Sequence, residues 1–282
     1  MIPLKDNVRS HAFPVVTVAL IALNLLAFAW QLTLSDGRAS SLELSMAGVS
    51  ERDAFTIEHG AVPFRLAHPG SSCGVTAEDI VCGKGALTTE EGSELIRVPD
   101  DLAEPAWWTT PLSAMFMHVD LLHFLVAMIG LLVFGRTVEA TIGRWRFLTL
   151  YLLSGLAAIY LQVLWDPNAT GPIIGAAGAV AGVIGAYAVS YARARVVGLW
   201  VIPPFGTLVE IPSYVLIAIW FLLLIVPGLG RAATPDVAEE TITYLAYVAV
   251  FALAAVAGRL LVREPLPFER AGAAPRREPA HG

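Results

Sequence analysis

The sequence predicts an all-α protein that spans a membrane six times, and three observations lead to this fold class. Of the 282 residues, 56% are hydrophobic and only 15% are charged, and the mean hydropathy is +0.66. Soluble globular domains carry about 25% charged residues. Six long apolar segments divide the chain, and Lys and Arg gather on one side of them. The combination indicates a polytopic membrane protein rather than one or two soluble domains.

The apolar segments have the lengths expected of transmembrane helices, because a hydrocarbon core of ~30 Å needs about 20 apolar residues. Polar or glycine-rich interruptions weaken the hydropathy signal of the second and fourth. A signal peptide is the alternative for the first, but the segment exceeds the ~7–15 residues of such an apolar region, and no small-x-small cleavage site follows promptly. The six expected spans are residues 13–34, 112–134, 147–164, 172–191, 214–229 and 242–262.

The positions of the basic residues predict the orientation. An excess of Lys and Arg in short loops marks the cytoplasmic side, so both termini are expected in the cytoplasm, and the net charge of −6 reflects an acidic outer side. Arg231 is an exception. Nucleic-acid binding has no support, and we expect an integral protein of a bacterial plasma membrane. The basic residues on the predicted inner side are Lys5, Arg9, Arg136, Arg144, Arg146, Arg193, Arg195, Arg259, Arg263, Arg270, Arg276 and Arg277.

A long outer loop holds the two cysteines, Cys73 and Cys82. An oxidising outer face favours a disulfide between them; two free thiols are the alternative, and two Cys without nearby His pairs make a poor zinc site. A short interfacial helix is expected around 61–66, and Trp107 and Trp108 suit an interfacial anchor. The expected parts of the chain are a cytoplasmic lead-in (1–12), the first span (13–34), the outer loop (35–111), a five-helix core (112–262) and a disordered cytoplasmic tail (263–282).

Three groups of polar residues inside the predicted core are candidates for chemistry. We expect Glu139, in a cytoplasmic turn, to pair with a nearby arginine. His118, Asp120 and His123 could suggest a metal site, but two histidines five apart on a helix diverge by about 500°, which favours hydrogen-bonded histidines and no metal. A nucleophile formed by Ser113 with His123 would need a rebuilt site.

Several segments together give the chain a family resemblance. They are MIPLKD at the start, MFMHVDLLHFLVAMIGLLVFG, GRTVEATIGRWRF, GAAGAVAGVIGAY and SYARARV. The chain resembles the rhomboid intramembrane serine proteases, a resemblance that implies a six-helix rhomboid-like bundle. In that family a serine at the start of span four and a histidine on span six form a catalytic dyad, and a His-x-x-x-Asn pattern on span two helps to bind the oxyanion.

Three of the four chemical positions differ from the family pattern. Ala177 matches the serine, Tyr247 matches the span-six histidine, and Ala127 matches the asparagine. His123 matches the histidine on the oxyanion side, and His118 matches an upstream histidine that the family uses structurally. An alanine methyl cannot attack a carbonyl, so the resemblance implies a scaffold without its nucleophile and base.

We therefore expect a rhomboid pseudoprotease that binds transmembrane segments of client proteins within the lipid bilayer, without a cofactor. Small residues on spans four and six would preserve close helix packing. The alternatives are an intramembrane serine-type endopeptidase, in an unorthodox or inactivated form, and a receptor or scaffold that acts through its outer loop. Joint loss of three positions favours natural divergence over a single inactivating change. The expected client-binding cavity comprises His118, His123, Gly175, Ala177, Gly178 and Tyr247.

Overall fold

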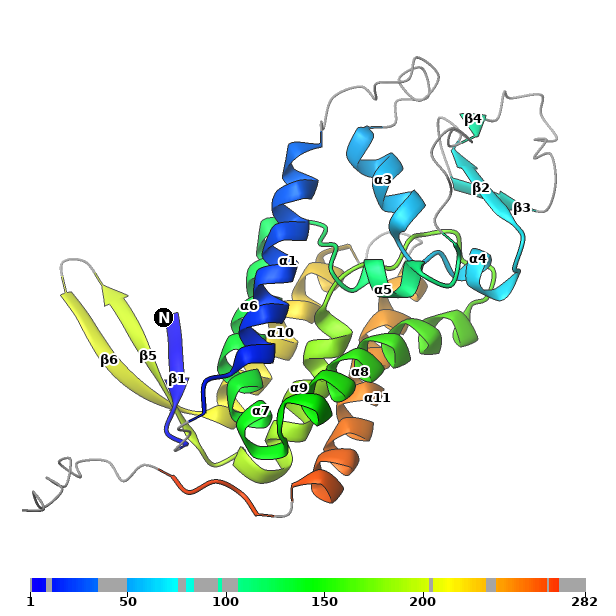
Figure 1. Ribbon diagram of the computed structural model, residues 1–282. Helices are drawn as coiled ribbons and strands as arrows, with labels where there is room; N and C mark the ends of the chain where they lie inside the picture. The colour runs from blue at the N-terminus through cyan, green and yellow to red at the C-terminus, as the bar shows by residue number, and fades with distance from the viewer. Residues whose placement is uncertain are drawn as a thin grey trace, which may run out of the picture.

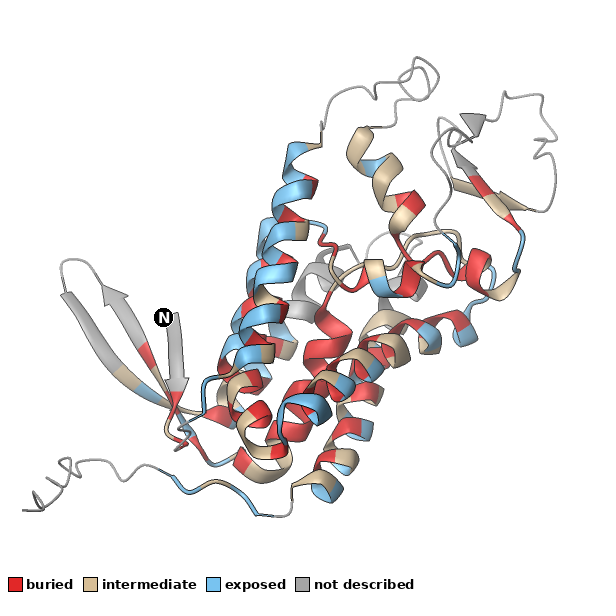
Figure 2. Cartoon of the chain, in the orientation of Figure 1, coloured by how far each residue is buried: buried red, intermediate tan, exposed pale blue. Residues whose placement is uncertain are grey.

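The computed structural model shows a helical bundle built around one buried helix, α9 (Ala177–Tyr191). It describes residues 2–8, 12–34, 50–75, 80–83, 96–97, 106–202, 205–231, 237–262 and 264–268. Every residue of α9 from Ala177 to Tyr187 is buried, and this part of the helix is red in Figure 2. A helix that is apolar on all sides is typical of a position at the centre of a membrane bundle.

Among the described residues, four helical segments have the length and composition to cross a membrane. They are α1 (Val15–Thr33), the continuous run of α6 (Leu121–Gly130), η1 (Leu131–Gly135) and α7 (Arg136–Ile142), then α8 (Arg144–Trp165), and residues Ile242–Leu261 of α11 (Val237–Leu261). The other two expected spans correspond to apolar helices that are shorter in the residues searched, α9 and the Ser213–Leu223 part of α10 (Ser213–Arg231). Four of the six spans are thus supported, and the other two stay predictions.

Glycines set the distance between α9 and its neighbours. A Cβ added at Gly185 would collide with the carbonyl oxygen of Phe251, and one added at Gly258 would lie 2.8 Å from Ala186 Cα. The backbones of α9 and α11 therefore touch with no side chain between them. Such contacts between small residues are a common basis of helix association in membranes.

The prediction of an all-α fold was wrong in detail, because two small antiparallel sheets accompany the bundle in the described part of the chain. One has the order β1-β5-β6 and joins the N-terminal strand β1 (Ile2–Asp6) to a hairpin of β5 (Arg195–Ile202) and β6 (Phe205–Pro212). The other has the order β3-β2-β4. The hairpin follows α9, and Figure 1 shows it beside β1 at the same end of the bundle as the turn between α7 and α8. Its Val- and Ile-rich strands pair from Arg195 with Pro212 to Ile202 with Phe205.

Glu139 corrects a second expectation. Its carboxylate accepts hydrogen bonds from the backbone amides of Val16 (2.9 Å) and Thr17 (2.8 Å) and from the Thr17 hydroxyl (2.8 Å), rather than pairing with an arginine. The residue before α1 is Pro14, whose side chain cannot accept a hydrogen bond. The first amides of a helix need acceptors and favour negative charge. Glu139 therefore caps α1 from a distant part of the chain.

Asp6 joins the N-terminal strand to the same end of the bundle. It is buried, and its carboxylate accepts hydrogen bonds from the hydroxyls of Thr137 (2.7 Å) and Tyr187 (3.1 Å). Burial raises the pKa of Asp6 above its ordinary value, although the two hydroxyl donors oppose this shift. The segment expected to be a lead-in is thus part of the packed structure.

The outer region contains the expected short helix and the expected disulfide. Helix α3 (Glu51–His59) is capped by Ser50, and α4 (Pro63–Ala67) corresponds to the helix predicted around 61–66. Cys73 on β2 (Ser72–Val75) and Cys82 on β3 (Ile80–Gly83) face each other in the strand register and form a disulfide. A two-residue strand, β4 (Ile96–Arg97), completes the sheet. Residues 35–49 and most of 84–105 lie outside the described part of the chain.

The second span begins later than predicted, and part of the tail is folded. Residues 112–120 contribute to a short helix, α5 (Thr110–Ala114), and to a loop, and α6 begins only after Asp120. At the other end, the Leu266 amide donates to the Tyr191 hydroxyl (2.7 Å) and Phe268 forms a β-bridge with Val8. The predicted disorder of 263–282 is therefore wrong for 264–268, and residues 269–282 lie outside the described part.

Candidate functional site

The loop before α9 brings the expected site residues together. The Gly175 amide donates to the Ala114 carbonyl (2.8 Å), which joins this loop to α5. Gly175 has φ +122°, a backbone conformation that residues with a Cβ rarely adopt. A Cβ added there would lie 2.5 Å from Cε1 of His123. A residue with a Cβ would therefore be excluded twice, by the backbone and by the imidazole ring. Ala177, which begins α9 two residues later, is fully buried.

His123 and Ala127 lie one turn apart on α6, as the spacing predicts. The Asp120 carboxylate caps this helix by accepting from the His123 amide at 2.7 Å. The imidazole ring extends over Gly175, whereas Ala127 is fully buried. The predicted oxyanion side of the site thus retains its histidine beside the loop that precedes α9.

His118 corrects the expectation that the two histidines diverge. It lies before the start of α6, so helical spacing does not apply, and its ring centroid is 5.4 Å from that of His123. The His118 amide donates to Gln31 Oε1 at 2.9 Å, whereas among the described atoms neither ring nitrogen has a hydrogen-bond partner. Burial, assisted by His123, lowers the pKa of His118 to about 3, so the ring is neutral at physiological pH.

Tyr247 packs against the start of α9 from α11. Its side chain is 8% exposed, and its Cε1 atom would lie 3.5 Å from a Cβ added at Gly178. The ring therefore lies over the residue next to Ala177 rather than pointing toward lipid. The small residue that this ring faces is Gly178, and the hypothesis that Ala177 leaves space for Tyr247 stays a prediction.

The hydroxyl of Ser113, the alternative nucleophile, is bound to backbone carbonyls. The Ser113 hydroxyl donates to the carbonyl of His59 (2.6 Å) and also contacts that of Thr110 (3.1 Å), rather than the ring of His123. Within the described ranges, no hydroxyl is hydrogen-bonded to a histidine ring, and no group of three or more His, Cys, Asp or Glu side chains could hold a metal. The pairing of Ser113 with His123 is absent from this arrangement.

Sequence reasoning missed two residues that border the site. The Trp220 indole on α10 donates to the Val126 carbonyl on α6 at 3.1 Å, and Gln31 on α1 accepts from His118. For Gln31 a signal existed: Thr17, Asn24 and Gln31 recur every seven residues on the apolar first span, and all three are buried. Polar residues at such a period share one helix face. The indole bond of Trp220 has no comparable sequence signal.

The bundle, its central glycine-rich helix, and the buried His118 and half-buried His123 beside that helix define an integral membrane protein of a recognisable class. The family model for the Rhomboid domain matches residues 105–264, more than half of the chain. The chain therefore belongs to the rhomboid family.

A curated relative gives a shorter match. "RHOMBOID-like protein 5" of Arabidopsis thaliana is 33% identical over 75 residues, which cover 27% of this chain and 24% of that protein. The match thus spans about a quarter of the relative's length.

Proposed function

We propose that this rhomboid is a pseudoprotease that binds transmembrane segments of client proteins without cutting them. The observation that carries the proposal is the composition of the site. The residues that match the family's serine, span-six histidine and asparagine are Ala177, Tyr247 and Ala127, and none of them can act as the activated nucleophile, its general base or the amide donor.

The packing of the site supports the retention of a binding scaffold. The His123 ring occupies the space that a Cβ at Gly175 would fill, and Tyr247 packs over Gly178 at the start of α9. This fit supports a scaffold that is retained around the positions matching the family's active site. The His123 ring and the ring nitrogens of His118, which have no hydrogen-bond partner among the described residues, offer polar groups to the backbone of an unwound segment.

We propose that a client segment enters the site between α6 and α10. Helices α6 and α10 border the site, and the hydrogen bond from Trp220 to Val126 joins them. A client segment would approach laterally from lipid, separate this pair and reach the loop at Gly175. The client is thus identified by its chemistry as an apolar helix with a readily unwound stretch.

Loss of catalysis is tested with a fluorophosphonate probe on the purified full chain. We expect no labelled serine. A matched control is the variant carrying Ala127→Asn, Ala177→Ser and Tyr247→His, which restores all three side chains. Labelling of any serine in the unmodified chain that also blocks cleavage of a peptide substrate would overturn the pseudoprotease assignment in favour of an unorthodox endopeptidase.

Client binding is tested by photocrosslinking in native membranes. Tyr247 is replaced by p-azidophenylalanine, which is nearly isosteric with tyrosine, and Tyr160, 41% exposed on α8, receives the same replacement as a control. We expect crosslinks from position 247 to transmembrane segments of other proteins, beyond those from position 160. Equal products from both positions would overturn the proposal. Crosslinks that disappear when residues 70–95 are deleted would assign binding to the outer loop.

A further inference from the structure

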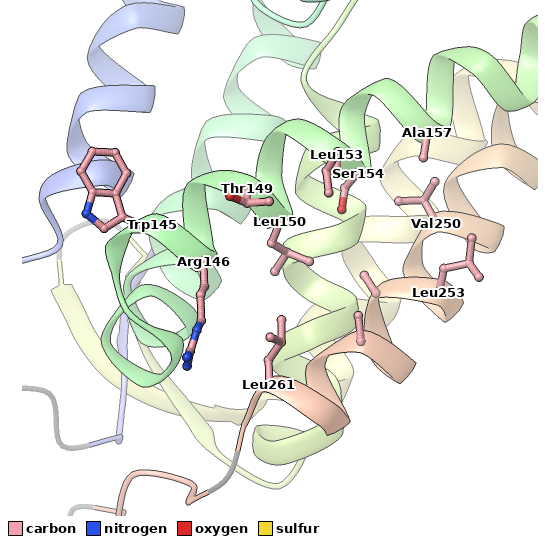
Figure 3. A pocket seen from close by; sticks show the side chains of 12 residues that line it. Trp145, Arg146, Thr149, Leu150, Leu153, Ser154, Ala157, Val250, Leu253 and Leu261 are labelled. Carbon is pink, nitrogen blue, oxygen red and sulfur yellow. The ribbon is translucent and has the colours of Figure 1, made fainter.

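A groove lies between α8 and α11, away from the candidate site. Its cavity volume is 440 Å³, and Figure 3 shows side chains from both helices directed into it. From α8 come Leu150, Leu153 and Ala157, and from α11 come Val250, Leu253 and Leu261. The wall is mainly aliphatic along most of its length.

The groove has a polar end. Arg146 and Thr149, one turn apart on α8, line it on the side where the chain's N-terminal strand lies (Figures 1 and 3). In the part of the chain that the structure describes, no carboxylate pairs with the Arg146 guanidinium. Trp145 beside it is 81% exposed, and exposed tryptophans are enriched where a membrane helix meets the headgroup layer. We therefore expect the Arg146 guanidinium to lie at the depth of lipid headgroups.

The dimensions of the groove distinguish between occupants. The α8 residues that line it rise by ~16 Å from Arg146 to Ala157. A volume of 440 Å³ over that length corresponds to a channel roughly 6 Å across. An α-helix with its side chains is ~10–12 Å in diameter. An α-helix is too wide to lie within the groove, whereas a single hydrocarbon chain is narrow enough.

We propose that the groove between α8 and α11 is a binding site for an anionic phospholipid. One acyl chain lies between the two helices, the Arg146 guanidinium binds the headgroup phosphate through charge-assisted hydrogen bonds, and the Thr149 hydroxyl donates to the same headgroup. Charge complementarity selects anionic over zwitterionic lipids, because each arginine near an anionic headgroup layer contributes to attraction. The site is independent of client binding at α6 and α10.

The test uses the full chain in nanodiscs that contain phosphatidylcholine and phosphatidylglycerol, followed by native mass spectrometry of the lipid that stays bound. We expect the unmodified chain to retain phosphatidylglycerol preferentially. Arg146→Gln should lower that preference about fivefold, the factor that corresponds to ~1 kcal/mol per arginine, and Arg146→Lys should restore most of it. Arg193→Gln is the matched control, because Arg193 is exposed after α9 and does not line the groove.

The acyl-chain slot is tested separately with Ala157→Phe, which should reduce retention of both lipids. A phosphatidylglycerol with a photoreactive acyl chain, used on the unmodified chain, should label α8 and α11 at the groove, and this result does not depend on any variant folding. An unchanged preference in Arg146→Gln, an equal loss in Arg193→Gln, or labels confined to other helices would overturn the proposal. So would a crosslink between two copies of the chain across the groove.

Discussion

Glu139 shows how one side chain can determine the position of a whole helix. Its two oxygens satisfy the first amides of α1, which have no local cap. The acid and the helix end also complement each other in charge. His118 is a second buried polar residue near a helix start, where burial lowers its pKa to about 3.

Replacement of Glu139 by glutamine should lower the free energy of unfolding by about 1–2 kcal/mol, because the amide retains one acceptor but loses the charge and the second acceptor. Thermal unfolding in detergent micelles measures the change. Glu210→Gln is the control, since Glu210 is 42% exposed and its pairing with Arg195 contributes little. Equal stability of the two variants would mean that Glu139 does not support α1.

The lowered pKa of His118 predicts a pH dependence of stability. As pH falls, the His118 imidazole is protonated in the unfolded chain near pH 6.5 but in the folded chain only near pH 3. Its contribution to the free energy of unfolding is therefore complete above pH 6.5 and is lost as pH falls toward 3. Between pH 7.5 and pH 5 the unmodified chain should lose about 2 kcal/mol from this residue. His118→Gln should remove that part of the pH slope, and an unchanged slope would contradict the assignment.

At the scale of elements, the sequence predicted which segments are helical better than how the helices meet. Hydropathy located α1, α8 and α11 because their apolar runs are continuous. Hydropathy did not reveal the hairpin after α9, because its strands contain the same apolar residue types as a transmembrane helix. The start of α6 was misplaced, although Asp120 three residues before His123 is a recognisable cap signal. The site was predicted as a set of residues, but the contact between His123 and Gly175 depends on a backbone turn that no local pattern specifies.

The contact between α6 and α10 predicts a change in access to the site. Trp220→Phe removes the donor to the Val126 carbonyl while keeping an aromatic ring, and leaves that helix pair less firmly joined. In the photocrosslinking assay, the probe at position 247 should then give a higher yield of client crosslinks. Tyr214→Phe, at a side chain on α10 that is 58% exposed, is the control. A yield that falls or stays constant would argue against entry between these helices.

At the scale of the whole molecule, both ends of the described chain meet on one side of the bundle. The N-terminal strand, the hairpin after α9 and residues 264–268 lie there, whereas α3, α4 and the disulfide lie at the opposite end (Figure 1). The two groups are separated by the spanning helices. The basic residues lie mainly on the side of the termini, so they predict that this side faces the cytoplasm.

Single-cysteine labelling tests this orientation in a background that carries Cys73→Ser and Cys82→Ser. A membrane-impermeant maleimide added to intact cells should label Pro69→Cys, an exposed position of the outer region, and should label Ala12→Cys only after permeabilisation. The opposite pattern would invert the topology, and labelling of both from outside would contradict a common inner side for the termini.

The capping of α1 by Glu139 also has a consequence for biogenesis. The acid follows Val16 by 123 positions, which a ribosome adds in roughly 6–25 s at about 5–20 residues per second. During that interval the first span resides in the bilayer with the amides of its first turn open to water or chaperones. Final docking of the first span therefore waits for the second span to be synthesised, and a nascent chain arrested before Glu139 emerges should hold the first span in an undocked state.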